Sequence, residues 1–461
     1  MNPAPPAIPE ACRQRAPSRR KPVSLDSQAK DGATVSADSL SRPEIERLQW
    51  RKLAALLDTV TSANRFYAAK LSGGGAIRSL DDFREHVPLT TKRELVADQL
   101  AHPPYGTDLS HPFECYTRCH QTSGSTGAPL RWLDTPDSWQ HLLDNWRQIF
   151  AAAGVGRGDR LFFAFSFGPF LGFWTAIESA QQLGCFCFPG GSMTSPARLK
   201  AMLDHRVTVL CCTPTYAVHL GEVAQAEGLD RSKSCLRRII VAGEPGGSLP
   251  STRAHLAALW PEARVFDHYG MTEVGPATYE CPAEPGVLHV IESAYLAEVL
   301  DTTAGAPTPA GETGELVLTT LDRLGSPLLR YRTGDLVRPR HPGRCACGRH
   351  ELALEGGILG RTDDMVVVRG VNVFPSAVEE IVRGCGEVAE YRVRLDGRGS
   401  MTELSLEVEP APECSDVPAL GRRLQQRLQD ALSLRVPVAI LPGGALPRFE
   451  MKSSRWVRTA H

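Results

Sequence analysis

The sequence predicts an α/β protein with a large N-terminal domain of mostly parallel sheets, a small β-rich part and a small α+β C-terminal domain. Three observations favour this class. Apolar strand-like segments alternate with helical stretches up to about residue 267, alternation and turns follow from about 280 to 340, and a third texture begins past Gly360. Strands that alternate with helices build parallel sheets covered by helices on both faces.

Composition places the chain among ordinary globular enzymes. It has 461 residues, of which 42% are hydrophobic and 22% charged, with a formal net charge of −1. A near-neutral chain has no overall basic field for nucleic acid or for an acidic membrane surface. Without an apolar run of about 18 residues or a signal peptide, we expect a cytoplasmic protein with no nucleic-acid or membrane partner.

The first structured element is expected to begin at Ser41. Residues 1–40 are rich in Pro, Ser, Ala and Arg without periodicity, which predicts a disordered tail. Ser41 is suited to be the N-cap of a helix with Pro43 in its first turn and Glu44 near the positive end of the dipole. The apolar positions at helical spacing are Ile45, Leu48, Leu53, Leu56, Leu57 and Val60.

Two short helices are expected between residues 80 and 100. The second would open at Thr90 or Thr91, because Glu94 is then placed for a capping box. Beyond them the predicted sheet begins, and ligands of such sheets bind at the carboxyl ends of the strands. Strands are expected over 160–167, 207–213, 238–242 and 264–266, with helices around 136–153, 172–184, 196–205, 215–228 and 250–260.

The C-terminal half is expected to contain two further units. Alternation in 296–301 and 315–320 predicts a small antiparallel sheet or a distorted barrel, within a β-rich subdomain of about 280–355. The last unit is an α+β domain over 362–461, after an N-terminal core of 41–361. Its expected elements are strands at 365–368, 392–395 and 404–408 and helices at 375–382 and 416–432.

A glycine- and hydroxyl-rich stretch, TSGSTG at 122–127, is a candidate phosphate cradle. Six such residues form no packed element, but their backbone N–H groups and hydroxyls can converge on an anion. The stretch is not a Walker A loop, since no Gly-Lys-Ser/Thr closes it. Taken alone, it is equally typical of a solvated turn or linker.

Four more stretches follow in order, and together with TSGSTG they resemble the core motifs of the adenylate-forming superfamily of acyl-CoA synthetases, adenylation domains and luciferases. They are DHYGMTEVG (267–275), YRTGDL (331–336), GRTDDM (360–365) and LPRFEMK (446–452). Within the superfamily the chain resembles the phenylacetate–CoA ligase group over roughly 45–456. The residues that carry this are NRFY (64–67), PLTTK (88–92), VAGEPGG (241–247) and RGVNVFPS (369–376).

This resemblance implies two half-reactions. A carboxylate attacks the α-phosphorus of ATP and expels pyrophosphate, and a thiol of CoA then attacks the acyl adenylate and expels AMP. Catalysis by alignment and charge neutralisation is expected, with Lys452, Thr272 and Glu273 as catalytic residues and Glu273 as the Mg²⁺ ligand. The ATP-binding residues it implies are Thr122, Ser123, Gly124, Ser125, Thr126, Gly127, Gly243, Glu244, Pro245, Asp267, His268, Tyr269, Gly270, Asp335 and Arg361.

The resemblance also implies that residues 362–461 form a mobile lid. Asp363 would be its hinge, withdrawing Lys452 after adenylation. The same rotation of the lid would present Gly370, Val371, Asn372 and Phe374, which would form the tunnel for CoA. The last motif departs from the group, which usually has Ser-Glu-Gly where this chain has Phe449-Glu450-Met451.

The acid pocket is expected among aromatic residues that follow a predicted strand. Its candidates are Phe165, Phe167 and Phe170, with Gly275, although such a cluster is as often plain core. We expect an aryl acid without a second carboxylate. The alternatives are an enzyme that loads a carrier-protein phosphopantetheine and a non-catalytic binding protein, and a homodimer is also compatible with the sequence.

Three cysteines and one histidine form a further candidate site, for a metal ion. The chain has 13 cysteines, and several lie in apolar runs typical of buried free thiols. Cys345 and Cys347 lie instead in a Pro/Gly/Arg loop, and Cys281 and His289 flank a turn in the same β-rich region. These four residues suit a closed structural zinc site, and free thiols are the alternative.

Overall fold

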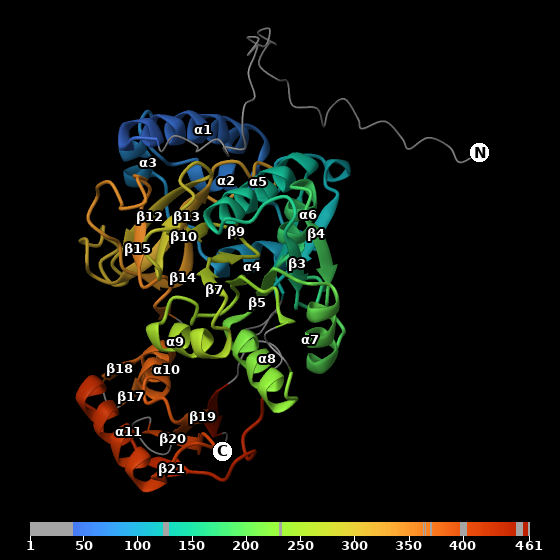
Figure 1. Ribbon diagram of the computed structural model, residues 1–461. Coiled ribbons are helices and arrows are strands. Elements are labelled where there is room, and N and C mark those ends of the chain that lie inside the picture. Colours follow the sequence, from blue (N-terminus) through green and yellow to red (C-terminus); the bar gives the residue numbers. More distant parts are fainter. Residues whose placement is uncertain are drawn as a thin grey trace.

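The computed structural model describes residues 40–122, 129–229, 233–362, 364, 366–368, 371–396, 403–448 and 455–459. A large α/β body lies above a smaller C-terminal domain (Figure 1). The predicted tail up to residue 39 lies outside these residues. Among the helices described, none combines the length and the apolar character needed to cross a bilayer.

The N-terminal helices begin where their capping residues predict. In α1 (Arg42–Ala63) the backbone N–H of Ser41 donates to Glu44 Oε2 at 2.8 Å. In α4 (Lys92–Ala101) the corresponding pair is Thr91 and Glu94, at 2.7 Å. Between them lie α2 (Arg65–Leu71) and α3 (Leu80–His86). The apolar stripe of α1 packs on Leu296, Leu321 and Leu329 of the β-rich region.

The central sheet is parallel, as predicted. Its five strands run in the order β4 (Phe186–Pro189), β3 (Arg160–Phe163), β5 (Val209–Cys212), β6 (Arg238–Val241) and β7 (Arg264–Asp267). Only β4 has no counterpart among the predicted strands, and its residues are partly exposed at the sheet edge. The strands β3, β5, β6 and β7 are buried on both faces and therefore read as continuous apolar runs.

Helices cover both faces of this sheet. Alternate strand residues belong to different cores: Phe163 packs with α5 (Pro136–Ala152) and α6 (Trp174–Gln182), whereas Phe162 packs on the opposite face. The helices of that second face are α7 (Ser195–Asp204), α8 (Pro214–Ala226) and α9 (Pro250–Leu259). Because helices cover both faces, the loops at the carboxyl ends of the strands are the part of the sheet that remains open to a ligand.

The β-rich region consists of two open antiparallel sheets. One has the order β10 (Thr278–Glu280), β11 (Val287–Val290), β15 (Ala353–Glu355), and the other β12 (Tyr295–Leu300), β13 (Gly314–Thr320), β14 (Tyr331–Val337), β16 (Gly360–Arg361). The expected distorted barrel is not closed in the described part of the chain. Closure needs pairing between the outer strands, and β12 and β16 remain the two edges of their sheet.

The C-terminal domain has its own core. Its sheet has the order β21 (Val438–Ile440), β20 (Glu403–Pro410), β19 (Val388–Asp396), β22 (Trp456–Thr459), and α10 (Pro375–Arg383) and α11 (Val417–Leu432) pack against it. The hairpin of β17 (Val366–Val368) and β18 (Val371–Val373) precedes α10. One contact to the larger domain joins Ser251 Oγ on α9 to Glu380 Oε2 on α10 at 2.7 Å.

Candidate active site

A cavity of about 510 Å³ lies at the carboxyl ends of β6 and β7, where the two domains meet. The larger domain contributes the loop that follows β6, the segment that follows β7, and residues of β14 and β16. The smaller domain contributes residues of β17, α10, β19 and β22. Those named in the sequence analysis are Gly243, Glu244, Pro245, Asp267, His268, Tyr269, Gly270, Asp335 and Arg361.

Asp335 and Arg361 face each other because β14 and β16 pair with these two residues in register. Arg361 Nη1 lies 3.0 Å from Asp335 Oδ1, and the hydroxyl of Tyr269 donates to Asp335 Oδ2 at 2.7 Å. Burial, reinforced by the Asp335 carboxylate, raises the pKa of Tyr269 well above its ordinary range, so the phenol stays protonated. The carboxylate is therefore fixed by two donors at the wall of the cavity.

A second carboxyl group, that of Asp267, lies at the end of β7. Burial raises its pKa to about 7, although the hydroxyl of Ser248 donates to Asp267 Oδ2 at 2.6 Å. The backbone N–H of Asp267 donates to Glu280, which Arg253 holds through both carboxylate oxygens at 2.9 and 3.0 Å. On the neighbouring loop, Glu244 accepts the backbone N–H of Thr215 at 2.8 Å.

The turn that carries Thr272 and Glu273 is held by Arg323. One guanidinium nitrogen, Nη1, donates to the carbonyls of Thr272 at 3.0 Å and Glu273 at 2.7 Å. The other nitrogens form a two-point ion pair with Asp134, both bonds being 2.7 Å, at the end of β2 (Arg131–Asp134). Burial lowers the pKa of Arg323, but the Asp134 carboxylate outweighs it and leaves the pKa above the ordinary value.

The carboxylate of Glu273 has Lys92 as its ionic partner. Lys92 Nζ lies 3.3 Å from Glu273 Oε1, an oxygen that is buried and makes no hydrogen bond with the described residues. Lys92 opens α4, and Thr90 fixes this segment beside β14 through backbone bonds to Arg330 and Arg332, both 2.9 Å. Lys92 remains 42% exposed, whereas Glu273 is 3% exposed.

Aromatic rings gather around the connection that follows β3, and Phe173 and Trp146 among them contact His268, which lines the cavity. The ring of Phe173 lies 5.3 Å from that of Phe165 and 5.8 Å from that of Trp146, and Phe165 in turn lies 6.2 Å from Phe167. Phe170 is half-buried in the same connection. Gly275, the other candidate for the acid pocket, has a φ of +86°, and a side chain there would meet Leu142 of α5.

Several predicted site residues lie outside the described part of the chain, namely Ser123, Gly124, Ser125, Thr126, Gly127, Asp363, Gly370 and Lys452. Their neighbours are described. Thr122 follows β1 (Arg118–Gln121), and its hydroxyl accepts the N–H of Leu130 at 3.0 Å. Val371 and Asn372 lie on β18, and Phe374 precedes α10 with its ring near Gly360.

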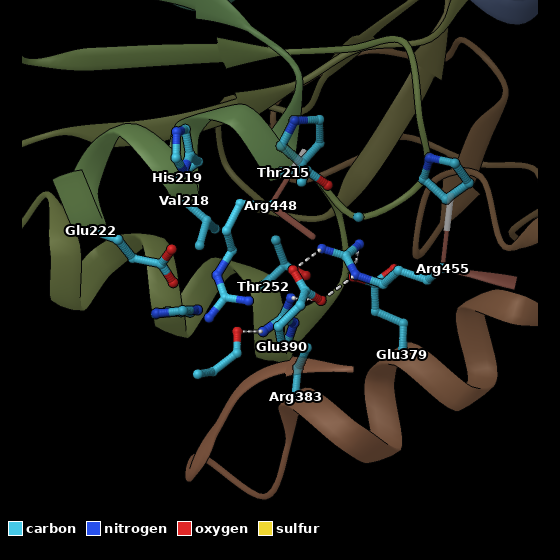
Figure 2. Close-up of a pocket in the computed structure, with 15 residues that line it drawn as sticks. Thr215, Val218, His219, Glu222, Thr252, Glu379, Arg383, Glu390, Arg448 and Arg455 are labelled. Atoms are coloured by element: carbon cyan, nitrogen blue, oxygen red, sulfur yellow. Dashed lines mark hydrogen bonds and ion pairs between the residues drawn. The ribbon is translucent and has the colours of Figure 1, made fainter. Parts of the chain in front are cut away.

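Arg455, three residues after Lys452, lies in a charged cluster between the domains (Figure 2). Its Nε is 2.7 Å from Glu390 Oε1 and its Nη1 is 3.5 Å from Glu379 Oε1, so β22 is tied to β19 and α10. Glu222 of α8 borders the same cluster, and burial raises its pKa. Arg455 also lines the 510 Å³ cavity.

The four candidate metal ligands converge away from this cavity. The Sγ and Nε2 or Nδ1 atoms of Cys281, His289, Cys345 and Cys347 all lie within 4.8 Å of one another. Cys281 Sγ is 3.6 Å from Cys345 Sγ, and Cys347 Sγ is 3.5 Å from His289 Nε2. His289 Nδ1 lies 3.4 Å from the carbonyl of Glu351, so a proton on Nδ1 leaves Nε2 available to a metal.

Sequence reasoning missed two residues of this site. Lys92 belongs to the PLTTK stretch, which was used for the resemblance without a role for its lysine. Arg323 has no motif around it, and its partners Asp134 and Glu273 lie 189 and 50 residues away. Of the two residues, only Lys92 lies in a motif, PLTTK, from which a role in the site could have been predicted.

Comparison with known proteins agrees with the arrangement of the chain. Residues 91–320 match the AMP-binding enzyme family and residues 370–459 the AMP-binding enzyme C-terminal domain. The phenylacetate-coenzyme A ligase of Thermus thermophilus is 31% identical over 448 residues, covering 90% of this chain and 96% of the relative. That of Escherichia coli K12 is also 31% identical, covering 92% and 95%.

Among solved structures, 2-hydroxyisobutyryl-CoA ligase in the postadenylation state, in complex with 2-HIB-AMP, has a TM-score of 0.86 at 26% identity, covering 92% of this chain and 91% of that one. Both the sequence and the fold therefore lead to one family. The chain belongs to the adenylate-forming AMP-binding enzymes, in the group of the phenylacetate–CoA ligases, and is an AMP-forming acid–CoA ligase.

Proposed function

We propose that the protein activates an aromatic carboxylic acid with ATP and transfers the acyl group to CoA. The observation that carries the aromatic assignment is the group of rings formed by Phe165, Phe167, Phe173 and Trp146, of which Trp146 and Phe173 contact His268 in the wall of the cavity. Flat apolar walls suit an aryl group. The phenylacetate-coenzyme A ligases among its relatives support the same choice.

In this proposal the ribose of ATP binds Asp335. Its carboxylate can accept from both ribose hydroxyls, and Arg361 and Tyr269 hold it in place. The loop of Gly243, Glu244 and Pro245 and the segment of Asp267, His268 and Gly270 form the remaining wall for the nucleoside. The stretch 122–127 binds the outer phosphates, and its first residue, Thr122, accepts a hydrogen bond from Leu130.

The α-phosphate is assigned to Thr272, whose backbone Arg323 orients. Glu273 is the proposed ligand of Mg²⁺, and the fit rests on its carboxylate oxygen Oε1, which is buried and without a hydrogen bond among the described residues. Glu273 would hold Mg²⁺ beside the triphosphate, and the ion would supply positive charge that offsets the phosphate oxygens. Lys92 neutralises Glu273 in the free enzyme.

Lys452 is proposed to supply the mobile cation between the acid carboxylate and the α-phosphate. Its position is supported by Arg455, which follows it by three residues and lines the cavity. After adenylation, rotation about Asp363 would withdraw Lys452 and bring Gly370, Val371, Asn372 and Phe374 to the CoA thiol. The lower TM-score of 0.69 to 2-hydroxyisobutyryl-CoA ligase in its thioesterification state, against 0.86 above, supports two domain arrangements.

The test separates the two half-reactions. Purified protein is incubated with ATP, Mg²⁺ and a panel of aromatic and aliphatic acids, and pyrophosphate release and thioester formation are followed with CoA or a holo carrier protein. We expect aromatic acids to give the highest kcat/KM and CoA to accelerate AMP release. If a thioester formed only with the carrier protein, that protein and not CoA would be the acceptor. A uniform preference for aliphatic acids would refute the aromatic assignment.

A variant tests the role of Lys452. Lys452→Ala should largely abolish pyrophosphate release while leaving thioester formation from supplied acyl adenylate near the wild-type rate. The reason is that only the first half-reaction brings the anionic carboxylate and the anionic α-phosphate together, and their repulsion needs a cation between them. Equal loss of both half-reactions would remove this assignment.

A structural zinc ion is proposed for Cys281, His289, Cys345 and Cys347. Four ligands at tetrahedral angles around zinc lie about 3.8 Å apart for two sulfurs and about 3.6 Å for sulfur and nitrogen. The separations of 3.6 and 3.5 Å fit this geometry without a disulfide. With four protein ligands the ion has no open position, so its role is to join β11 to the loop of Cys345 and Cys347.

A further inference from the structure

Arg253 and Glu280 form a buried ion pair behind the wall of the cavity that the nucleoside is proposed to occupy. Arg253 lies on α9 and Glu280 ends β10, and the two terminal nitrogens of the guanidinium donate to the two carboxylate oxygens at 3.0 and 2.9 Å. The side chain of Glu280 is fully buried and that of Arg253 is 18% exposed. Neither residue is among those of the described chain that line the 510 Å³ cavity, and neither belongs to the sequence motifs given above.

Arg253 also holds two backbone carbonyls. Its Nη1 donates to the carbonyl of Gly247 at 2.9 Å and its Nη2 to that of Val265, also at 2.9 Å. Gly247 directly follows the loop 243–246, which lines the cavity, and Val265 lies on β7, two residues before Asp267. The guanidinium therefore joins the loop that follows β6 to the last turn of chain before the β7 end of the wall.

Glu280 holds the other side of the same wall. Its Oε2 accepts the backbone N–H of Asp267 at 2.6 Å, the first residue of the segment 267–271 that lines the cavity. Its Oε1 accepts the N–H of Gly286 at 3.3 Å, in the turn that leads to β11, and Leu288 of β11 lines the cavity too. One ion pair thus fixes three separate segments of the wall relative to one another.

Stability alone explains this pair poorly. Taking two charges out of water is costly, and well-packed apolar side chains of similar volume are often as stable or more stable than a buried ion pair. Apolar side chains have no direction, however, whereas the planar guanidinium places its donors at fixed angles on a carboxylate and on carbonyls. The arrangement therefore suits the positioning of the wall segments better than it suits stabilisation of the fold.

We propose that Arg253 and Glu280 are positioning residues for ATP, which hold the loop 243–246 and the segment 267–271 at the separation that the nucleoside requires without touching the nucleotide. The inference rests on the proposed function, because it assumes that the nucleoside lies against this wall beside Asp335. The rings assigned to the acid come from α5 and from the connection after β3, so the pair acts on ATP and not on the acid.

The experiment measures ATP and the acid as separate ligands. Wild type and Arg253→Lys are assayed for pyrophosphate release with the best aromatic acid of the panel described above, and KM is determined for each ligand with the other saturating. We expect Arg253→Lys to raise KM for ATP on the order of 10- to 100-fold, since misplacement of a site by about 1 Å has effects of that size. KM for the acid should stay near the wild-type value. A purely structural defect would lower kcat through loss of folded enzyme and leave KM for ATP unchanged.

A double variant separates positioning from folding. Arg253→Met/Glu280→Gln leaves no unpaired buried charge, and glutamine retains an oxygen for the N–H of Asp267, so the melting temperature should stay near that of wild type. The carbonyls of Gly247 and Val265 lose their donor, so the affinity for ATP, measured by calorimetry without acid, should fall as in Arg253→Lys. A stable double variant with wild-type affinity for ATP would overturn the proposal.

The matched control is Arg330→Lys. Arg330 is also buried, pairs with Glu298 at two points, 2.8 and 2.9 Å, and donates to the carbonyl of Val87 at 2.7 Å, and these partners belong to none of the wall segments. Its KM for ATP should equal that of wild type, and a rise as large as in Arg253→Lys would refute a specific role for Arg253.

Calorimetry also separates this inference from the proposed function. If no acid supports pyrophosphate release, but wild type binds ATP and Arg253→Lys binds it more weakly, acid activation fails and the positioning role stands. If pyrophosphate is released and Arg253→Lys keeps the wild-type KM for ATP, the positioning role fails and acid activation stands. A wild type that binds no ATP would overturn both.

Discussion

The ammonium of Lys92 lies 3.3 Å from the carboxylate of Glu273, at a position where the family resemblance implies a magnesium ligand. Glu273 is buried and Lys92 is half-exposed, so the lysine is the partner that can move away. Its long flexible stem and compact charge suit a temporary counter-ion. The pair suggests that Mg²⁺ and Lys92 compete for the same oxygen.

Replacing Lys92 should expose this competition. Lys92→Met leaves the buried Glu273 without a counter-charge, and we expect a loss of stability on the order of 1 kcal/mol in metal-free buffer. Added Mg²⁺ should raise the melting temperature of this variant more than that of wild type. Lys70→Met is the control, because Lys70 forms its ion pair at 2.7 Å with Glu94 of α4 and not with Glu273. An identical response to Mg²⁺ in all three proteins would show that Lys92 does not compete.

Arg323 should matter to catalysis through the backbone that it holds. Arg323→Lys keeps the charge but cannot bind Asp134 and both carbonyls with one planar fork. We expect pyrophosphate release to fall by roughly 100-fold, since misplacement of a site by about 1 Å costs that much. Arg330→Lys is the matched control: Arg330 is also buried and holds Glu298 at two points, 2.8 and 2.9 Å. Both rates are measured below the melting temperatures, and equal losses would make the Arg323 effect one of stability alone.

The proposed ribose ligand can be tested with altered nucleotides. Asp335→Asn should raise KM for ATP by roughly 10- to 100-fold, because a hydrogen bond to a charged group contributes about 1.5–3 kcal/mol. In wild type, 2′-deoxy-ATP or 3′-deoxy-ATP should have a KM higher than that of ATP by a comparable factor. In Asp335→Asn the deoxy nucleotides should have nearly the same KM as ATP. Asp322→Asn, which breaks the ion pair to Lys52, provides the control. If the deoxy nucleotides raised KM in Asp335→Asn by the same factor as in wild type, the two effects would be independent. That outcome would contradict a contact between Asp335 and the ribose.

Asp267 should make stability depend on pH. Its pKa is about 7 in the folded protein and near 3.8 when unfolded, so the folded state binds a proton in this interval that the unfolded state releases. The associated stability is complete below about pH 4 and is lost as pH rises through 7. Asp267→Asn should therefore gain on wild type by on the order of 1 kcal/mol per pH unit between about pH 5 and 7. Denaturant unfolding at several pH values measures this, and parallel curves for the two proteins would refute the shift.

Metal removal tests the four-residue cluster. The purified protein should carry about one zinc per chain by elemental analysis, and Cys345→Ser should lose it together with several degrees of melting temperature. A chelator should lower the melting temperature of wild type and leave that of Cys345→Ser unchanged. Cys385→Ser replaces a thiol of the C-terminal domain outside the cluster and should keep its zinc. If wild type contained no zinc and a chelator left its melting temperature unchanged, the four residues would be free thiols and a free imidazole.

Much of the fold was predictable because it depends on neighbours in the chain. Glu94 caps its helix from three residues beyond Thr91, and the buried run Val209–Cys212 can hardly be anything but an inner parallel strand. For the β-rich region the sequence left a small antiparallel sheet and a distorted barrel as alternatives, and the described residues form open antiparallel sheets. Closure depends on which outer strands pair, and alternation within one strand carries no information on that. The order of the sequence motifs likewise identified the family without any knowledge of the geometry.

The sequence by itself therefore determined the parallel sheet, the order of the domains and some of the stretches that line the cavity, since periodicity, caps and motifs act over short distances. Tertiary structure alone decided which charges meet. Arg323 reaches Asp134 across 189 residues, and Lys92 reaches Glu273 from α4. Such contacts depend on how separate elements pack, and burial turns each of them into a strong constraint on charge and hydrogen bonding.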